Sequence, residues 1–328
     1  GHSGEFQMRV FVVGGTGFLG WHTVRSCLAR GWKATVLGLP PGPPKGLFAR
    51  GVRVLSGNLD DLSDARLRSM LRGHDALVFA AGMDERSTPP RPVYPKLRKA
   101  NVDDLQRVLT LARDAGATRG VVVGSYFAHF ARHWSELQLG SHHPYIRSRL
   151  EQERVARSVP GMAGMVVQLP YVFGALPVEG WQPLWAPLVR YLRQSGRLYY
   201  PDGGSACISA TVAGEAIAAA IERGKAGRRY PIGQENLDWS ELLMRLALAD
   251  GRQVRVHTLP ARLTRFGFQA GHWWNRLQGK ESGLDLPRFA ELQMERLFID
   301  PVPSQRALGY ALDDLDEALR ATVAAVVQ

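Results

Sequence analysis

A glycine-rich stretch near the start of the chain decides the fold, and it reads Gly14-Gly15-Thr16-Gly17-Phe18-Leu19-Gly20. The five residues before it, Arg9–Val13, are mostly apolar and predict a buried strand, and the residues after it have the pattern of a helix closed by Gly31. Glycines at 14, 17 and 20 permit a tight turn, the close approach of a pyrophosphate, and close packing of the helix on the strand. The free N–H groups and the positive dipole end of that helix favour an anion. The stretch therefore predicts a nucleotide-binding loop rather than a tight turn without a ligand.

Short apolar runs alternate with helical patterns through the first half of the chain. We expect strands at residues 34–37, 52–55, 76–80, 120–123 and 165–169, and helices at residues 17–30 and 145–159. Continuous apolar strands that alternate with helices are typical of a parallel sheet covered on both faces. The predicted fold class is therefore α/β, a doubly wound parallel sheet with a smaller, interleaved C-terminal lobe.

Composition excludes several classes of protein. The 328 residues are 45% hydrophobic and 22% charged, which is enough for one large domain or two modest ones with a real core. Cys27 and Cys207 lie far apart and form no CxxC pair, so a disulfide framework is not expected. The net charge of +11 comes from 35 arginines and 6 lysines scattered along the chain, so we expect no nucleic-acid partner. Prolines and glycines interrupt the long uncharged stretch 158–178, and we expect a soluble, cytoplasmic protein with no integral membrane segment.

Further motifs follow the glycine loop in a fixed order. They are Phe79-Ala80-Ala81-Gly82, Asn101-Val102, Val122-Val123-Gly124-Ser125, Tyr145-Ile146-Arg147-Ser148-Arg149, Leu169-Pro170-Tyr171-Val172-Phe173-Gly174 and Ala307-Leu308-Gly309-Tyr310. With the GxxGxxG spacing of the loop, this series resembles the extended short-chain dehydrogenases/reductases, which include the NAD-dependent epimerase/dehydratase family. In character it is most similar to the hydroxysteroid dehydrogenase and dihydroflavonol reductase branch. The resemblance spans most of the chain and implies a Rossmann fold that binds NAD or NADP.

The resemblance also implies a set of cofactor-binding residues. They are Gly14, Thr16, Gly17, Phe18, Leu19, Gly20, Gly38, Asn58, Leu59, Ala80, Ala81, Gly82, Tyr145, Arg149, Pro170 and Val172. Asn58 stands where the family usually has an aspartate facing adenine, and its amide oxygen can still accept from the adenine amine. The second strand ends without a carboxylate to hold a ribose diol, and Lys45 and Arg50 follow in a proline-rich loop. This favours NADP slightly over NAD, although a plain surface loop explains the two bases equally well.

Ser125, Tyr145 and Arg149 are the predicted catalytic residues. A tyrosine with a lowered pKa can move the hydroxyl proton of an alcohol when a cation lies one helical turn away, and Tyr145 and Arg149 are four residues apart. Ser125 ends a strand, where open α/β sheets bind ligands, and it can hydrogen-bond the reacting oxygen. Arg149 replaces the lysine of the family. Because arginine keeps the charge but does not deprotonate, we expect no proton relay through it.

Aromatic and histidine side chains supply the remaining candidates. The predicted substrate residues are Tyr126, His143, Tyr171, Trp181 and Trp185. The aromatic run that continues through Tyr191, Tyr199 and Tyr200 fits a substrate cavity and the core of the small lobe equally well. His129 and His133, like His142 and His143, lack a carboxylate or cysteine at ligand spacing, so we predict no metal. Trp273-Trp274, among Arg262, Arg265, Arg276 and Lys280, fit a lid or a subunit contact better than an interfacial helix.

The chain divides into a cofactor part and a substrate part. We read residues 1–7 as a cloning remnant and residues 8–170 as an NAD(P)-binding Rossmann domain, to which residues 205–233 return. Residues 171–204 and 234–328 form the expected substrate lobe. Ser209-Ala210-Thr211-Val212 stand where the family often has an acidic pair, and we have no functional account of that loss.

The favoured function is an NAD(P)-dependent oxidoreductase that acts on the ketone or alcohol of a mostly apolar small molecule. A cofactor-binding sensor or pseudoenzyme without turnover is the first alternative, because Arg149 replaces lysine. A sugar-nucleotide epimerase or dehydratase is the second. It is disfavoured because Tyr126-Phe127 follow Ser125 where family dehydratases have an acidic pair, and because no asparagine lies between Asn101 and Asn236. The expected partner is a small-molecule substrate, and a homodimer stays open.

Overall fold

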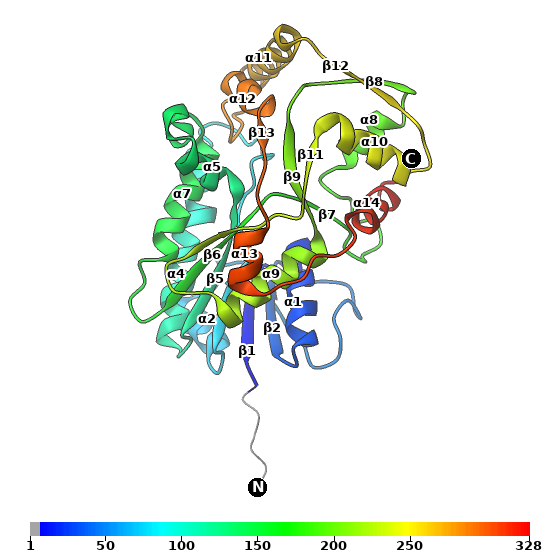
Figure 1. Cartoon of the computed structure of the whole chain (residues 1–328). Helices are drawn as coiled ribbons and strands as arrows, with labels where there is room; N and C mark the ends of the chain where they lie inside the picture. Colours follow the sequence, from blue (N-terminus) through cyan, green and yellow to red (C-terminus); the bar gives the residue numbers. More distant parts are fainter. Residues whose placement is uncertain (1–6) are drawn as a thin grey trace.

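The strand predicted before the glycine loop is β1 (Arg9–Val13), and it lies within a seven-stranded sheet in the computed structural model, which describes residues 7–328 (Figure 1). The expected cloning remnant lies outside the described residues, apart from Gln7. The sheet has the order β10-β6-β5-β4-β1-β2-β3, and every neighbouring pair is parallel. The other strands are β2 (Lys33–Gly38), β3 (Arg53–Ser56), β4 (Ala76–Phe79), β5 (Arg119–Ser125), β6 (Ala163–Leu169) and β10 (Arg229–Pro231). The predicted doubly wound α/β fold is confirmed.

Helices cover both faces of this sheet, which explains why its central strands are apolar on both sides. One face carries α1 (Phe18–Ala29), α9 (Ala210–Arg223) and α13 (Val302–Leu308), whose buried side chains share one core cluster with the sheet. The other face carries α2 (Asp64–Leu71), α4 (Asp104–Asp114) and α7 (Pro144–Ala156), which share a second core cluster. Two short segments precede α4: α3 (Tyr94–Arg98) and a π-helical turn, η1 (Lys99–Asp103).

A second lobe is built on a smaller sheet of four strands. Its central strand is β9 (Gly204–Ser209), which pairs with β7 (Tyr171–Phe173), β11 (Glu235–Asp238) and β13 (Arg296–Leu297). A further pair consists of β8 (Arg197–Tyr200) and β12 (Arg255–Thr258), and α8 (Ala186–Leu192), α10 (Trp239–Ala249) and α14 (Leu315–Ala324) pack around a third core cluster. We expected residues 205–233 to return to the Rossmann domain. Residues 205–209 instead belong to the second sheet, because all six residues of β9 are buried between partner strands there.

The remaining helices lie where the two lobes meet and at one end of the molecule. α5 (Tyr126–His133), η2 (Ser135–Leu137) and α6 (Leu139–His142) lead from β5 to α7, while α11 (Ala261–Leu277) and α12 (Leu286–Gln293) form the end farthest from the N-terminus in Figure 1. A fourth core cluster of mostly aromatic and large aliphatic side chains joins α5, α7 and α12. Within residues 7–328, none of the helices combines the length and the apolar character that crossing a bilayer requires.

The contact between α1 and α9 tests how tightly the layers pack. A Cβ at Gly214 would lie 2.5 Å from the carbonyl oxygen of His22 in α1. Because that atom belongs to a helix backbone, Gly214→Ala forces the helices apart and should lower the free energy of unfolding by about 1–3 kcal/mol. Gly267→Ala is the matched control, since Gly267 also lies in a helix but a Cβ there meets no atom within 4 Å. The control should raise the free energy of unfolding by about 0.5–1 kcal/mol. Chemical denaturation followed by circular dichroism measures both, and equal effects of the two substitutions would contradict this account.

Candidate active site

Two cavities adjoin the carboxyl-terminal edge of the parallel sheet. A cavity of about 500 Å³ lies against the glycine loop and the ends of β1, β2 and β4. A second cavity of about 190 Å³ lies against the ends of β5 and β6 and is lined by Ser125, Tyr145 and Arg149. Open α/β sheets bind ligands at this edge, because the loops that follow the strands are gathered there.

Most of the predicted cofactor residues line one of these two cavities. The larger cavity is lined by Gly14, Thr16, Gly17, Gly38, Asn58, Leu59, Ala80, Ala81 and Gly82. Phe18, Leu19, Tyr145, Arg149, Pro170 and Val172 line the smaller cavity. Gly20 lines neither cavity and is buried in the first turn of α1. The sequence reasoning missed Leu39, Pro43, Pro44, Leu47, Asp104, Leu176 and Val178, which also line the larger cavity. No motif marks these residues, because segments distant in the sequence bring them there.

The glycine loop has the geometry that a bound pyrophosphate needs. Gly14 has a φ of +80°, and a Cβ there would lie 2.8 Å from the backbone of Ala80. A Cβ at Gly20 would lie 2.3 Å from the carbonyl oxygen of Gly14. At Gly17 the nearest atom would lie at an ordinary 3.5 Å, and this residue lines the cavity at the N-cap of α1. Gly14 and Gly20 thus hold the fold together, while Gly17 keeps the space beside the helix N-terminus open. The residues present fit a dinucleotide.

The cavity wall near the end of β2 carries no basic side chain. Leu39, Pro43, Pro44 and Leu47 supply that part of the lining, whereas Lys45 and Arg50 are exposed and do not contribute to it. The amide oxygen of Asn58 accepts the backbone N–H of Asp60 at 3.0 Å, which holds the side chain in a local turn at the cavity wall. The wall therefore contains neither a carboxylate that would repel a 2′-phosphate nor a lysine or arginine that would bind one.

The three predicted catalytic residues come together in the smaller cavity. Tyr145 and Arg149 lie one turn apart on α7, and Arg149 Nε donates a hydrogen bond to the Tyr145 hydroxyl oxygen at 2.9 Å. Arg149 Nη1 donates to the carbonyl oxygen of Val123 at 3.1 Å and to Gln152 Oε1 at 2.9 Å. Ser125 is the last residue of β5 and caps α5 by accepting the N–H of Phe127 at 3.1 Å. Arg149 is therefore held in place by three partners and fixes its charge beside the phenol.

The sequence predicted a lowered pKa for Tyr145, and the structure corrects this. Burial raises the pKa of Tyr145 to about 12, although Arg149 and a hydrogen bond from Ser125 both lower it. The carboxyl group of Glu85 adds to the rise. Removing a phenolate from water outweighs the attraction of one nearby cation, so the phenol keeps its proton at neutral pH.

Buried hydrogen bonds fix the catalytic helix relative to the end of β4. Asn101 lies in the π-helical turn η1 and is fully buried. Its amide oxygen accepts the N–H of Met83 at 2.9 Å, and its amide nitrogen donates to the Met83 carbonyl at 3.0 Å and to Ser148 Oγ at 3.1 Å. Ser148 Oγ in turn donates to the carbonyl oxygen of Tyr145 at 2.7 Å. The loop after β4 and the backbone of Tyr145 are therefore joined through two side chains, those of Asn101 and Ser148.

Three of the five predicted substrate residues line the catalytic cavity. Tyr126, Tyr171 and Trp185 do so, with the Tyr126 hydroxyl 2.8 Å from Ser205 Oγ and Trp185 Nε1 donating to the Val172 carbonyl at 3.0 Å. Tyr191, Tyr199 and Tyr200 line neither cavity at the edge of the sheet. Tyr191 and Tyr200 pack against the core of the small lobe, and Tyr199 is exposed and stacks on His257.

Trp181 and His143, the other two predicted substrate residues, do not line the catalytic cavity. Trp181 packs against Phe18, with ring centroids 5.2 Å apart, and lines neither cavity. His143 is buried against Phe289, and its Nδ1 accepts the backbone N–H of Asp285 at 3.0 Å. Burial lowers the pKa of His143 to about 4, so its ring is neutral at physiological pH and serves as an acceptor that fixes the segment before α12.

The loop after β4 contributes charged residues that the sequence reasoning missed. Asp84, Glu85 and Arg86 line the catalytic cavity together with the aromatic side chains. The Arg86 guanidinium lies 4.6 Å from the centroid of the Trp185 ring. Burial raises the pKa of Glu85, which favours the protonated carboxyl group. The sequence offers no signal for these roles, because the loop carries no motif and its conformation depends on Asn101.

Histidine pairs occur near the cavity but form no cluster of metal ligands. His129 and His133 stack on α5 with ring centroids 5.7 Å apart, and His142 lines a different cavity beside α11. No group of three or more His, Cys, Asp or Glu side chains in residues 7–328 is arranged to hold a metal ion.

Comparisons with known proteins found a family model, related sequences and similar solved structures. A sequence model of the NAD dependent epimerase/dehydratase family matches residues 10–233. A 4-hydroxy-2-methyl-3-oxo-4-farnesyl-3,4-dihydroquinoline-1-oxide ketoreductase of Stigmatella aurantiaca is 26% identical over 320 residues, which cover 93% of this chain and 92% of the relative. The crystal structure of gox2253 is similar with a TM-score of 0.77 and 20% identity, covering 96% of both chains. The dTDP-glucose 4,6-dehydratase DesIV of Streptomyces venezuelae, a double mutant crystallised with NAD and DAU, gives a TM-score of 0.67 at 22% identity, covering 97% of this chain and 96% of that chain.

The Asn101 network yields a stability prediction. Asn101→Ala removes three buried hydrogen bonds and leaves the N–H and carbonyl of Met83 without their partner, so it should lower the free energy of unfolding by about 2–4 kcal/mol. Asn275→Ala is the control, because Asn275 is half-buried and its side chain forms no hydrogen bond with the described residues. Urea denaturation compares the two variants. A loss at Asn101 no larger than the loss at Asn275 would show that the network contributes nothing to stability.

Proposed function

The chain belongs to the NAD dependent epimerase/dehydratase family, and from this premise we propose that it reduces a ketone on a mostly apolar small molecule, with Tyr145 as the proton donor. It is an NAD(P)-dependent oxidoreductase of the extended short-chain dehydrogenase/reductase type. The observation that carries the proposal is that the Tyr145 hydroxyl, which accepts from Arg149, lies with Ser125 in a cavity whose lining includes several aromatic side chains. The ketoreductase of Stigmatella aurantiaca supports it as a relative.

The glycine loop and the end of β4 would hold the dinucleotide, whose nicotinamide supplies the hydride when it is bound. We assign the pyrophosphate to Gly17 and the N-terminus of α1. Pro170 and Val172 form the wall of the catalytic cavity, so we place the nicotinamide end of the site there. Arg149 Nη2 makes none of the hydrogen bonds that fix this side chain, and it is available to a ribose hydroxyl.

The chain's own groups handle the proton. Because the pKa of Tyr145 is raised to about 12, its phenol is protonated at neutral pH and donates to an oxygen that gains negative charge during reduction. Ser125 then donates a hydrogen bond to that oxygen, and Arg149 stabilises the phenolate that remains. Arginine keeps its own proton throughout, so the tyrosine is the only group of this pair that titrates.

The shape of the cavity favours an apolar substrate with at least one polar group beside the reacting carbon. Tyr126, Tyr171 and Trp185 would contact the apolar surface of the substrate, and Glu85 supplies a carboxyl group to the lining of the same cavity. We propose that Glu85 forms a hydrogen bond with this polar group. Members that turn over sugar nucleotides need polar contacts to a diphosphate. Family dehydratases also have an acidic pair directly after the residue that corresponds to Ser125. Here Tyr126 and Phe127 occupy those positions and both are buried, which disfavours the sugar-nucleotide alternative.

The choice of dinucleotide rests on the wall formed after β2. We propose that NADPH is accepted, because Leu39 stands where a carboxylate would repel the 2′-phosphate. NADH is not excluded by this wall, since no basic residue is required for its ribose diol. Titration calorimetry with NADH and with NADPH therefore shows which dinucleotide the protein binds more tightly.

Gly17→Val tests cofactor binding without threatening the fold. A side chain at this position has room within the protein but enters the cavity beside the helix N-terminus. We expect wild-type protein to bind NADH or NADPH and the variant to bind at least about a hundredfold more weakly. The valine side chain would displace the pyrophosphate from the helix N-terminus, so that several hydrogen bonds to backbone N–H groups are lost. The melting temperature of the variant should stay within a few degrees of wild type. Absence of binding by the wild-type protein would overturn the enzyme proposal.

Tyr145→Phe tests the proton donor. It should lower the rate of ketone reduction by about 10²–10⁴-fold, whereas Tyr94→Phe should leave the rate unchanged, because Tyr94 donates to Glu151 outside the cavity. Reduction should be independent of the ionisation of Tyr145 between about pH 6 and pH 9, and oxidation of the product alcohol should rise with pH because it needs the phenolate. Substrates for the screen are bulky apolar ketones and sugar nucleotides. Turnover of sugar nucleotides alone would contradict the proposal.

Substitutions of Arg149 test whether the protein is an active enzyme or a cofactor sensor. Arg149→Lys keeps the charge and should retain activity within about threefold, and Arg149→Met should lose at least about tenfold, because one fixed charge near a phenol is worth more than one pKa unit. Arg147→Met is the matched control, since Arg147 lies on the same helix but is exposed and pairs with Glu151. If the dinucleotide binds tightly and no substrate is turned over, the sensor takes the place of the enzyme.

A further inference from the structure

One helix presents an apolar stripe to solvent. Leu263, Phe266, Ala270, Trp273, Trp274 and Leu277 follow one another at spacings of three or four residues along α11, apart from the adjacent tryptophans, and form what we call the outer stripe. Spacings of this kind place side chains on one face of a helix. Phe266 is 64% exposed, Trp273 55%, Trp274 61% and Leu277 82%. An exposed patch with two tryptophans is unusual on a protein surface and marks an interaction site.

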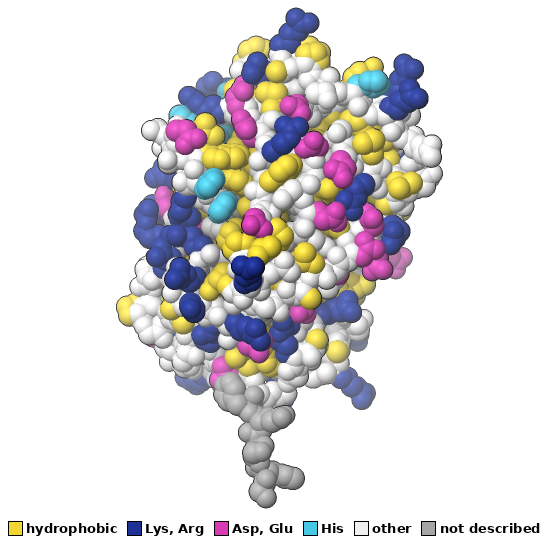
Figure 2. Space-filling model, in the orientation of Figure 1, with side chains coloured by type: hydrophobic (Ala, Val, Ile, Leu, Met, Phe, Trp, Pro, Cys, Tyr) yellow, Lys and Arg dark blue, Asp and Glu magenta, His cyan; other side chains and the backbone are white. Residues whose placement is uncertain are grey.

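The opposite face of α11 packs against the protein, so the outer stripe faces solvent. Thr264 is buried, and Phe268 contacts Phe289 of α12 with ring centroids 5.7 Å apart. α11 lies at the end of the molecule farthest from the N-terminus (Figure 1). Yellow and dark blue side chains lie next to each other at this end of the space-filling view (Figure 2). The helix is therefore held from one side and available from the other.

Cations flank the outer stripe. Arg262 lies four residues before Phe266, and Arg276 lies three residues after Trp273, so both are neighbours of the stripe on the helix surface. Lys280 follows the helix directly. Arg262, Arg276 and Lys280 are exposed, and none of them forms an ion pair within residues 7–328. The positive charge beside the stripe is therefore not neutralised by the protein.

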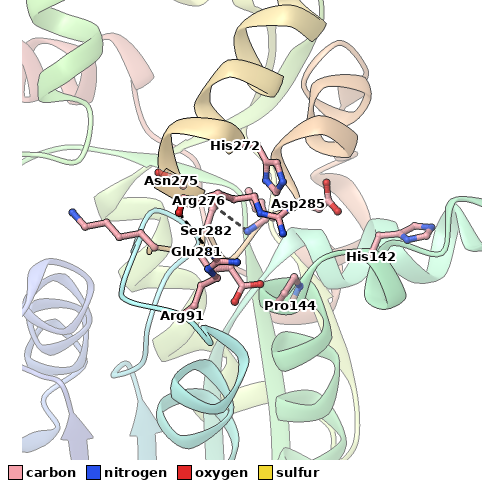
Figure 3. A pocket seen from close by; sticks show the side chains of 11 residues that line it. Arg91, His142, Pro144, His272, Asn275, Arg276, Glu281, Ser282 and Asp285 are labelled. Carbon is pink, nitrogen blue, oxygen red and sulfur yellow. Dashed lines mark hydrogen bonds between the residues drawn. The ribbon is translucent and has the colours of Figure 1, made fainter. Parts of the chain in front are cut away.

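The carboxylates near this end of α11 are engaged elsewhere. Arg91, His272 and Arg276 line a cavity of about 270 Å³ beside the end of the helix, together with Glu281 and Asp285 (Figure 3). Glu281 accepts the backbone N–H of Val93 at 2.8 Å, and Asp285 caps α12 and pairs with Arg288 at 3.1 Å. Glu281 and Asp285 share this cavity with Arg276, but neither forms an ion pair with it.

The sequence pattern favoured a lid or a subunit contact for this segment, but from its exposed stripe we propose that the outer stripe of α11 binds the surface of an anionic lipid bilayer. Tryptophan and phenylalanine prefer the boundary between headgroups and acyl chains, and arginine and lysine beside them attract anionic headgroups. A helix with one apolar stripe and flanking cations lies in the plane of such a surface, with its apolar side inserted. The helix is not apolar enough to cross the bilayer, which agrees with binding from one side.

A second copy of the chain is a poorer occupant of the stripe. A twofold interface places the same surface of both copies against each other. Arg262, Arg276 and Lys280 of one copy would then face the same unneutralised cations of the other, and like charges across an interface oppose association. An anionic bilayer accepts the apolar side chains and attracts the cations beside them. This complementarity favours the bilayer over a second copy of the chain.

Vesicle flotation of the whole protein tests the proposal. Vesicles of phosphatidylcholine alone and of phosphatidylcholine with phosphatidylglycerol serve as probes. We expect the protein to float with the anionic vesicles and to bind the neutral ones at least about tenfold more weakly, since each basic residue near an anionic surface adds about fivefold. Raised salt should weaken binding to the anionic vesicles.

Substitutions in the outer stripe of α11 test whether this stripe, and not another part of the surface, binds the vesicles. The double variant Trp273→Ala, Trp274→Ala should lower binding to anionic vesicles by at least about tenfold, because it removes the largest apolar groups that insert. Met244→Ala with Leu248→Ala on α10 is the control, as both side chains are exposed and lie beside Arg197, Arg252 and Arg255, but this surface carries no tryptophan. The control should bind as wild type does. Unchanged far-ultraviolet circular dichroism establishes that each variant is folded.

A second pair of variants tests the cations. Arg262→Gln with Arg276→Gln should lower binding by about twentyfold, and Arg197→Gln with Arg255→Gln, exposed arginines of β8 and β12, should leave it unchanged. Failure of wild-type protein to float with anionic vesicles would overturn the proposal. So would a dimer, seen by light scattering, that the tryptophan variant abolishes while vesicles do not bind, because the stripe would then be covered by a second copy.

Discussion

The close contact between the glycine loop and the end of β4 is the constraint on which the site depends. Gly14 lies so near the backbone of Ala80 that no side chain fits between them, and Gly20 lies as near to Gly14. The first turn of α1 is therefore held against the carboxyl ends of β1 and β4, and its free N–H groups face a cavity instead of protein. The neighbouring strands β5 and β6 then supply the reacting end of the site, since they follow β4 in the same parallel sheet.

Burial and charge oppose each other at Tyr145, the proposed proton donor. Arg149 is fixed by the carbonyl of Val123 and by Gln152, so its charge stays beside the phenol, and burial nevertheless dominates the pKa. The backbone of Tyr145 is held from two sides, through Ser148 toward Asn101 and through its N–H, which donates to the carbonyl of Gly283 at 2.7 Å. A phenol held this rigidly and this far from water is suited to give up a proton only to a base that forms in contact with it.

The second lobe links the catalytic residues to the far end of the molecule. Gly283 belongs to the segment that joins α11 to α12, and Phe289 of α12 packs on Phe127, which in turn packs on Tyr145. α11 therefore uses one face to complete the aromatic core around the catalytic helix and leaves the other face to solvent. This division explains why a helix with so many exposed aromatic side chains is stably folded: its inner face supplies the packing.

The sequence alone indicated the alternation of strands and helices in the parallel sheet, the glycine loop, and Ser125, Tyr145 and Arg149 as candidate catalytic residues, because apolar runs, glycine spacing and a four-residue helical interval are local properties. Only the tertiary structure decided the rest. The raised pKa of Tyr145 depends on burial by distant segments, and Glu85 and Arg86 reach the cavity on a loop held by Asn101. His143 and Trp181 looked equivalent to Tyr171 and Trp185 as sequence neighbours of the site, yet they turn to other partners. Strand β9 joined the second sheet for the same reason: pairing and packing between segments far apart in the chain are set by the whole fold, and no short pattern encodes them.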